Sequence, residues 1–485
     1  MDVKKIQKKT ASATKWSTIS EFAAKCIVPI TNMILARLLT PEAFGVVATV
    51  NMIVSFADVF RDAGFQKYLI QHDFDSIETL DKYTNVAFWT NLLISIILWA
   101  IICIFSTPIS IAVGNPGLEM VIIVASASLP LTSFSSIQMA RFKREFDFKT
   151  LLPIRIISVL IPFVVTVPLA FVFHNYWALI IGTVAGNLAN AVLLTLKSQW
   201  KPGLYYNFNI LKDMFWYSWW ILLESISVWA TTYIDTFIVG LFLSTYYIGL
   251  YKSAMSTVNQ IMGLIIAATA APLFSALSRL KNDKNALEET YLRYIRAISL
   301  VVFPLGIGIW LYKDVVVQIL LGGQWTEATD FVGLWGLIYA VTIVLGSYCN
   351  SIYNAIGKTY LSLLSQILQL AALIPTVLWA VQGGYEKLFI SRSVIRLEII
   401  IVQFIIMRAA LNIKAIKQLK MIGPAVVGSV IMGLAGLGLS FLGASITWQF
   451  VSILICMAVY IALLWGFYRS IFIEALELLG IKRIN

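Results

Sequence analysis

The sequence predicts an all-α polytopic membrane protein with about fourteen transmembrane helices. One observation is composition: hydrophobic residues make up 59% of the 485 positions, charged residues only 13%, and the mean hydropathy is +0.83. Soluble domains have roughly 45–50% apolar and about 25% charged residues. The composition therefore excludes an ordinary cytosolic enzyme, a nucleic-acid-binding domain and a disordered protein. The other observation is the number of long apolar segments.

A helix needs about 20 mostly apolar residues to cross a bilayer, and many segments of this chain reach that length. The predicted spans are residues 16–39, 43–66, 83–106, 117–140, 151–173, 176–196, 215–242, 246–274, 294–312, 329–355, 359–381, 388–409, 421–442 and 447–468. Most of them begin or end near Pro, Gly, Asn or a charged residue. The lysine-rich N-terminus precedes an apolar run without a cleavage site, which predicts a retained first helix rather than a removable signal peptide.

The distribution of basic residues predicts the orientation. With the N-terminus placed in the cytoplasm, 25 of the 36 Lys and Arg residues fall in cytoplasmic segments and nine inside spans; only Lys313 and Lys387 fall in external loops. Basic residues concentrate on the cytoplasmic side of membrane proteins. We therefore predict a multi-pass protein of the cytoplasmic membrane with both termini in the cytoplasm. The net charge of +11 reflects this asymmetry and does not indicate nucleic acid.

Two short turns repeat at an offset of 204 residues. Arg37–Gly45 joins the first two spans and Leu241–Gly249 joins the seventh and eighth, so that Gly45 aligns with Gly249. Six spans, an even number, separate the copies, and parallel halves often hold a transporter's substrate between them. The predicted domains are an N-terminal six-helix lobe at 1–200, a C-terminal six-helix lobe at 201–411, and helices 13 and 14 with a cytoplasmic tail at 412–485.

The first of these turns also carries a family resemblance. Leu38–Gly45 (LLTPEAFG), then Phe60–Phe65 (FRDAGF) and Tyr68–Gln71 (YLIQ), resemble the start of the polysaccharide transporter (Wzx-type lipid-linked oligosaccharide flippase) family. That family belongs to the multidrug/oligosaccharidyl-lipid/polysaccharide exporter superfamily. The resemblance implies two six-helix lobes around a central cavity plus two extra C-terminal helices. It also implies a flippase that moves undecaprenyl-pyrophosphate-linked oligosaccharide to the outer leaflet for surface polysaccharide assembly.

Charged residues within the spans mark candidate sites, because they are costly in a bilayer and usually face a bundle interior or a wet cavity. Lys25, Asp58 and Glu224 each lie roughly 12–13 Å from the cytoplasmic end of their span, at a helical rise of about 1.5 Å per residue. Glu21 lies one turn before Lys25 and can pair with it. These four residues form a predicted inner layer.

A second layer is predicted nearer the outside. Asp235 and Lys252 lie roughly 10 Å deep on helices joined by a short turn, and Arg37 lies closer to the surface. Helical spacing places Asn51 on the face of Asp58, and Asn259 on the face of Lys252. The candidate substrate-binding residues, for pyrophosphate and sugar, are Lys25, Arg37, Lys252, Asn51 and Asn259. The candidate ion-coupling residues are Glu21, Asp58, Glu224 and Asp235.

A packing role competes with each of these assignments. The pairs Lys25–Glu21 and Asp235–Lys252 can serve only to hold helices together, and Asp58 suits either role. Four charged residues near cytoplasmic span ends are expected to snorkel to the headgroup layer. They are Arg61, Asp62, Arg155 and Arg296. Arg392 and Arg396, in span twelve, remain open between the two interpretations.

The expected function is transport without catalysis. Only two histidines occur and the four cysteines lie far apart, so we expect no catalytic site, metal site or cofactor. The chain lacks a complete Walker loop. Acidic residues within the spans suggest coupling to H⁺ or Na⁺ in an antiporter. The expected partners are lipid-linked oligosaccharide, membrane lipids, a polysaccharide polymerase and glycosyltransferases, without nucleic acid.

Two alternatives stay open. One is a cation-coupled multidrug exporter of the same superfamily, against which fourteen spans and intramembrane Lys and Arg argue. The other is a membrane polysaccharide polymerase or ligase. Such an enzyme is expected to carry a substantial external loop, whereas the longest predicted external loop here has about sixteen residues (Lys313–Ala328).

Overall fold

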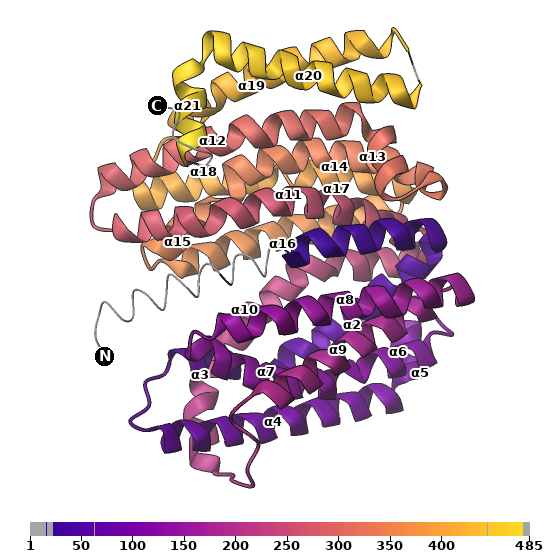
Figure 1. Cartoon of the computed structure of the whole chain (residues 1–485), viewed down its shortest axis with the longest axis vertical. Helices are drawn as coiled ribbons and strands as arrows, with labels where there is room; N and C mark the ends of the chain where they lie inside the picture. The colour runs from indigo at the N-terminus through magenta and orange to yellow at the C-terminus, as the bar shows by residue number, and fades with distance from the viewer. Residues whose placement is uncertain (1–15, 17–22, 63, 444, 479–485) are drawn as a thin grey trace. The chain divides into compact units, whose positions relative to one another are not determined.

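The computed structural model describes residues 16, 23–62, 64–443 and 445–478, and every regular element within them is a helix. The predicted all-α class is therefore confirmed. The chain divides into two compact units, residues 1–249 and 250–485 (Figure 1). The predicted lobe boundaries at residues 200 and 411 stay a prediction.

The first unit contains a helix over residues 23–38 and a series of numbered helices. These are α2 (Pro41–Asp62), α3 (Phe65–Gln71), α4 (Ile77–Ile104), α5 (Ser106–Ala112), α6 (Glu119–Ser126), α7 (Ser128–Arg144), α8 (Phe148–Phe173), α9 (Trp177–Lys197) and α10 (Phe208–Phe242). The division between the units falls near the start of α11 (Thr245–Arg279).

The second unit holds the rest of α11 and all later elements. These are α12 (Lys284–Leu311), α13 (Lys313–Leu320), the 3₁₀ helix η1 (Gly323–Ala328), α14 (Thr329–Thr342), the π-helix η2 (Ile343–Ser347), α15 (Cys349–Ala355), α16 (Thr359–Val381), α17 (Gly384–Ile395), α18 (Glu398–Leu411), α19 (Ala415–Ser440), α20 (Ile446–Phe467) and α21 (Arg469–Leu478).

Within the described residues, twelve helices or merged helices are long and apolar enough to cross a membrane. They include Glu119–Arg144, which combines α6 and α7, and Gly323–Ala355, which runs from η1 to α15. Of the remaining predicted spans, 16–39 is described only in part, and 388–409 coincides with α17 and α18, which a turn interrupts. The multi-pass class is confirmed, and the number fourteen stays a prediction.

A glycine separates α2 from α3 inside the FRDAGF motif. Gly64 has a φ of +81°, a left-handed conformation that side chains other than glycine rarely adopt. A Cβ at this position would also lie only 2.9 Å from the Cβ of Ile221 in α10. The change of direction after α2 therefore depends on glycine, and it brings Phe65 into a buried cluster.

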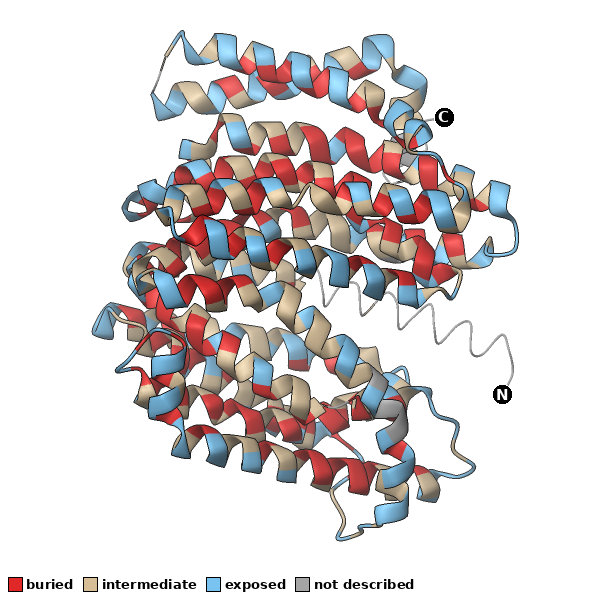
Figure 2. Ribbon diagram, turned by 180° about the vertical axis from the view of Figure 1, so that it is seen from behind, coloured by how far each residue is buried: buried red, intermediate tan, exposed pale blue. Residues whose placement is uncertain are grey.

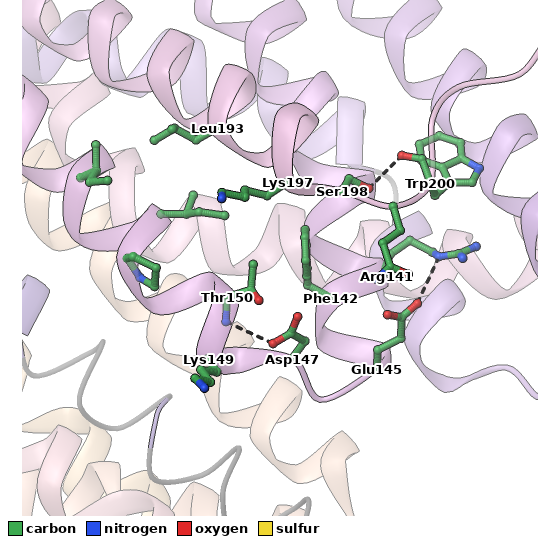
Figure 3. Close-up of a pocket in the computed structure, with 14 residues that line it drawn as sticks. Arg141, Phe142, Glu145, Asp147, Lys149, Thr150, Leu193, Lys197, Ser198 and Trp200 are labelled. Carbon is green, nitrogen blue, oxygen red and sulfur yellow. Dashed lines mark hydrogen bonds and ion pairs between the residues drawn. The ribbon is translucent and has the colours of Figure 1, made fainter.

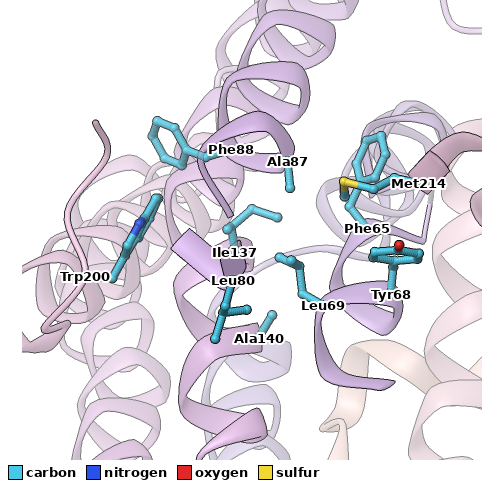
Figure 4. Close-up of a cluster of buried hydrophobic side chains, with 10 residues drawn as sticks. All are labelled: Phe65, Tyr68, Leu69, Leu80, Ala87, Phe88, Ile137, Ala140, Trp200 and Met214. Atoms are coloured by element: carbon cyan, nitrogen blue, oxygen red, sulfur yellow. The ribbon is translucent and has the colours of Figure 1, made fainter. Parts of the chain in front are cut away.

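That hydrophobic cluster joins α3, α4, α7 and the start of α10 in the first unit (Figure 4). Its members are Phe65, Tyr68, Leu69, Leu80, Ala87, Phe88, Ile137, Ala140, Trp200 and Met214. Arg144 closes the end of α3, because its guanidinium donates to the carbonyl oxygens of Leu69 at 2.8 Å and His72 at 2.6 Å. Burial raises the pKa of the Tyr68 phenol to about 12, so this ring stays neutral.

The second unit is built around α12 and the merged segment Gly323–Ala355. In the most apolar window of that segment 72% of the residues are buried, so the segment forms a protein core. The corresponding figure for α8 in the first unit is 11%, so most of the α8 surface is not covered by protein. Figure 2 shows the burial of each residue. The last helices pack on α12. The phenol of Tyr312 lies 2.7 Å from Ser452 Oγ, and that of Tyr460 donates to the Leu300 carbonyl at 2.9 Å.

Candidate functional site

A polar pocket of about 230 Å³ lies inside the first unit, between α2, the α6–α7 segment, α9 and α10. Its polar lining residues are Asn51, Ser55, Asp58, Ser128, Thr132, Thr183, Asn187 and Tyr233. The structure thus brings together Asn51, a predicted substrate ligand, and Asp58, a predicted ion-coupling residue. Ser128, Thr132, Thr183 and Asn187 come from α7 and α9, which carry no predicted site residue.

The serine and threonine hydroxyl groups of this pocket are committed as donors. Ser128 Oγ donates to the Ala125 carbonyl at 2.6 Å, and Thr183 Oγ1 donates to the Leu179 carbonyl at 2.8 Å. A hydroxyl has one donor and two acceptor lone pairs, so each of these groups offers the pocket only lone pairs. Together with the Asp58 carboxylate they make a lining of hard oxygen acceptors, which suits H⁺ or Na⁺ better than an anion.

Asp58 is held by an arginine three residues later. Arg61 Nε lies 2.7 Å from Asp58 Oδ1; the Arg61 side chain is 5% exposed and that of Asp58 42%. The expectation that Arg61 snorkels is therefore wrong, because the helix turn directs it into the protein, where the carboxylate partly neutralises it. Asp62 Oδ1 is also buried and has no hydrogen-bond partner among the described residues; snorkelling of Asp62 stays a prediction.

A tryptophan of α10 fixes the neighbouring turn of α2. Trp229 Nε1 donates to Ser55 Oγ at 3.1 Å, and its ring packs on Phe56 with centroids 4.6 Å apart. Trp229 also stacks on Tyr233, which lines the pocket. One wall of the pocket is therefore positioned by aromatic contacts between helices far apart in sequence.

Glu224 does not join this pocket. It lies on the exposed side of α10, where Glu224 Oε2 is 3.3 Å from Lys67 Nζ; both side chains are at least half exposed. Such an exposed pair contributes roughly 0–1 kcal/mol to stability. The predicted inner layer is thus divided in the structure: Asp58 lines a pocket, whereas Glu224 lies on an exposed surface.

The other predicted residues of the first unit lie in different surroundings. Lys25 is half-buried on the helix 23–38, and Glu21 lies outside the described residues. Arg37 is exposed and donates to the Met33 carbonyl at 2.7 Å. Asp235 is fully buried, and its Oδ1 accepts from the Thr236 amide at 2.7 Å. Their predicted roles stay predictions.

A second polar group lies in the second unit, where two arginines pack on aromatic rings. The helical spacing of α14 places Phe331, Trp335 and Tyr339 on one face. The Arg396 guanidinium carbon lies 4.7 Å from the Trp335 ring centroid and 4.2 Å from that of Tyr339. Arg392 lies 5.1 Å from Trp335 and is only 3% exposed. We call Trp335, Tyr339, Arg392 and Arg396 the arginine–aromatic cluster.

Both helices that carry this cluster are interrupted where they meet. Arg396 Nε donates to Thr342 Oγ1 at 3.2 Å. Thr342 is the last residue of α14 before the π-helix η2, and Arg396 stands in the turn between α17 and α18. Transporters often build binding sites at such helix discontinuities, and π-helical turns occur frequently at functional sites.

Asn259 connects α11 to the cluster. Its Oδ1 accepts from Trp335 Nε1 at 3.2 Å, so the predicted substrate residue orients the indole on which the arginines stack. Lys252 lies half-buried two turns earlier in α11. Asp235 and Lys252 belong to different units, and their predicted pair stays a prediction.

Sequence reasoning missed the aromatic half of this cluster. The spacing of four between Arg392 and Arg396 inside an apolar segment was a signal for the arginines. The rings of α14 carry no such signal, because aromatic residues at helical spacing are also typical of a core. Arg296 pairs with Glu474 of α21, and Arg155 is exposed; snorkelling stays a prediction for both residues.

Within the part of the chain that the structure describes, no group of three or more His, Cys, Asp or Glu residues is arranged to hold a metal ion. The four cysteines occur as free thiols.

The fold resembles that of a solved transporter. The structure titled "Lipid II flippase MurJ, inward closed conformation" matches with a TM-score of 0.77 over 94% of this chain and 99% of that chain, at 14% sequence identity. At this identity the match concerns the fold alone. It agrees with the polytopic helical class derived from the sequence.

Characterised proteins show sequence similarity over most of the chain. The succinoglycan biosynthesis transport protein ExoT of Rhizobium meliloti (strain 1021) is 22% identical over 66% of this chain and 64% of its own length. The lipopolysaccharide biosynthesis protein WzxC of Escherichia coli (strain K12) is 22% identical over 70% of both chains. The sequence pattern of the polysaccharide biosynthesis protein family matches residues 34–330, more than half of the chain. These matches confirm the resemblance found in the N-terminal motifs: the chain belongs to the polysaccharide biosynthesis protein family.

Proposed function

We propose that this protein is a flippase that moves undecaprenyl-pyrophosphate-linked oligosaccharide across the cytoplasmic membrane by ion-coupled alternating access. The observation that carries the proposal is the family match over residues 34–330, within a multi-pass helical chain. ExoT and WzxC, by their names, serve polysaccharide biosynthesis, and ExoT in transport. A transporter of this kind would supply polysaccharide assembly with sugars attached to a polyprenyl lipid. The proposed function includes no catalytic step.

Ion coupling is assigned to the polar pocket of the first unit. Asp58 is its carboxylate, and the surrounding hydroxyl lone pairs and amides can coordinate a monovalent cation or stabilise a bound proton. Uptake of H⁺ or Na⁺ would neutralise Asp58 and weaken its hold on Arg61, which changes the local charge of α2. Asp235, buried on α10, is the second candidate, and Glu21 and Glu224 complete the predicted set.

The anionic head group requires cations. Lys25, Arg37 and Lys252 are the proposed pyrophosphate ligands, with Asn51 and Asn259 as sugar ligands. Arg396 joins them, because its half-buried guanidinium is held by Tyr339, Trp335 and Thr342 in a fixed orientation. A guanidinium is a planar two-pronged donor for phosphate oxygens.

The prenyl tail is assigned to an apolar cavity of about 570 Å³ in the second unit. It lies between α12 and α20, where Pro304, Gly308, Met432 and Ile461 contribute to an almost wholly apolar lining. A polyprenyl chain is itself a flexible hydrocarbon, so it can occupy this cavity without any hydrogen bond being lost. The sugars then travel separately from the tail.

Complementation tests the proposal. The wild-type gene should restore surface polysaccharide in a strain that lacks its flippase and should prevent accumulation of lipid-linked oligosaccharide in the inner leaflet. The double variants Lys25→Ala/Glu21→Gln and Lys252→Ala/Asp235→Asn should reach the membrane at near-normal levels and fail to complement. Arg replacements at either lysine should keep partial function, because the positive charge is retained.

The same strain separates the alternatives. Wild-type protein that exports cationic dyes and leaves lipid-linked oligosaccharide in the inner leaflet would identify a multidrug exporter instead. Full complementation by both neutral double variants would move the phosphate ligands elsewhere, with Arg396 first in line. Copurification of a polymerase or a glycosyltransferase would establish the proposed partners.

A further inference from the structure

A second pocket lies at one end of the first unit, at the ends of three helices (Figure 3). It has a volume of about 570 Å³ and is enclosed by the last turn of α7, the first turns of α8, the last turn of α9 and the segment that follows α9. It shares no residue with the polar pocket around Asp58. Neither the proposed transport cycle nor the family match assigns it a role.

The charged side chains around this pocket differ in whether they have a partner. Arg141 is neutralised by Asp81 and lies 3.8 Å from Glu145, and the Asp147 carboxylate accepts the Thr150 amide at 3.1 Å as the cap of α8. Two lysines remain among the lining residues. Lys149 and Lys197 are both exposed, and neither forms an ion pair or hydrogen bond with any residue in the described part of the chain. Figure 3 shows the Lys197 side chain extended across the pocket, above Thr150 and Asp147.

The floor of the pocket is apolar and continues into the outer surface of two spans. Leu193 lines it from α9 and Ile157 from α8. Ile157 is 41% exposed, and Val164, two turns further along α8, is 62% exposed. Because α8 has the least buried window among the candidate spans of the described residues, this surface is suited to contact acyl chains.

The pocket therefore has two lysine ammonium groups at the level where helices end and a hydrocarbon surface leading into the membrane. An amphiphile with an anionic head group and acyl chains satisfies both halves. A soluble anion would leave the apolar floor uncovered, and a neutral lipid would leave the lysines unpaired. The geometry points to a binding site for an anionic phospholipid, with the head-group phosphate between Lys149 and Lys197 and an acyl chain along Ile157 and Leu193.

Native mass spectrometry of the full-length protein tests this site. The protein in detergent is titrated with dioleoylphosphatidylglycerol and, separately, with dioleoylphosphatidylcholine. Each lysine near an anionic lipid contributes about a fivefold change in affinity, so Lys149→Gln/Lys197→Gln should weaken binding of phosphatidylglycerol by about 25-fold if the two act independently. The matched control is Lys414→Gln/Lys420→Gln, which removes two exposed lysines near the start of α19 and should bind as the wild type does.

A variant of different chemistry makes the test independent of charge. Leu193→Trp keeps both lysines and fills the floor, and should weaken phosphatidylglycerol binding at least as strongly as one lysine substitution does. Equal affinity of the wild type for the two lipids would overturn the site. So would unchanged binding in the lysine double variant, or displacement of phosphatidylglycerol by millimolar inorganic phosphate, which would identify a free-phosphate site.

Discussion

The backbone of Gly45, in the first turn of α2, lies directly against the carbonyl oxygen of Thr245, and a Cβ at position 45 would overlap that oxygen. Gly249 makes the equivalent contact with the carbonyl of Pro41. The two contacts are related by the 204-residue repeat offset. Gly45 corresponds to Gly249, and Thr245 corresponds to Pro41. The two turns that repeat in the sequence are therefore packed on each other reciprocally through their glycines.

Substitution of Gly45 by alanine should destabilise the protein, because the added methyl group meets backbone atoms that cannot rotate away. Overpacking of this kind costs about 1–3 kcal/mol, and Gly249→Ala should have a similar effect. The control is Gly438→Ala in α19, where a Cβ would meet nothing within 4 Å and helix propensity favours alanine. Thermal unfolding of the detergent-solubilised variants measures the difference, and equal midpoints for Gly45→Ala and Gly438→Ala would contradict the contact.

Replacement of Asp58 separates ion coupling from packing. Asp58→Asn leaves the buried Arg61 with a neutral partner, which should cost about 1–3 kcal/mol of stability. Adding Arg61→Leu should recover much of this loss, because no buried cation then remains. If Asp58 also binds the coupling ion, the stable double variant should still lack gradient-dependent transport in proteoliposomes. Gradient-dependent transport at the wild-type rate would reduce Asp58 to a structural role.

The arginine–aromatic cluster should be sensitive to the shape of its cation. Arg396→Lys keeps the charge but loses stacking on Tyr339 and the Nε bond to Thr342. Stacking and hydrogen bonding each contribute about 0.5–2 kcal/mol, so thermal stability should fall and complementation should weaken. Arg408→Lys, at the exposed end of α18, is the matched control and should behave as the wild type does. Equal behaviour of the two variants would show that the cluster is dispensable.

Trp335 should couple energetically to Arg396. Trp335→Phe removes the indole donor to Asn259 and weakens the cation–π contact. In a double-mutant cycle with Arg396→Lys, the combined loss of unfolding free energy should be smaller than the sum of the single losses by about 0.5–2 kcal/mol. Strict additivity would mean that the two side chains do not stabilise each other.

Cysteine labelling checks the orientation. Cys349 and Cys456 are buried, so only Cys26 and Cys103 need replacement before new cysteines are introduced. A cysteine at Pro116, which is exposed between α5 and α6, should react with an impermeant maleimide in intact cells.

On the opposite side, Lys143→Cys at the exposed end of α7 should react only after permeabilisation. Asn115 is a poor labelling position in the same external turn, because it is 6% exposed and accepts a hydrogen bond from Thr245. External labelling of Lys143→Cys would reverse the predicted topology.

The sequence by itself determined the helical membrane class, the repeated turns and the polar face of α2. These properties depend on local composition and periodicity. The free energy of inserting a residue into a bilayer is favourable for apolar and unfavourable for charged side chains, and it depends chiefly on the residue type and its depth. The N-terminal motifs likewise carried the family resemblance, and the structure requires glycine at two of their positions: Gly64 has a positive φ, and Gly45 makes a close backbone contact.

Only the tertiary structure decided where the charges point. Asp58 pairs with the buried Arg61, whereas Glu224 pairs with Lys67 on an exposed surface. Asp58 and Glu224 nevertheless lie at a similar predicted depth. The arginine–aromatic cluster joins α14 to the turn after α17 across more than fifty positions of the chain. Partners of this kind follow from which helix faces meet and at which register. A single sequence cannot specify them, because apolar residues surround each helix on nearly every side and several packings would bury them equally well.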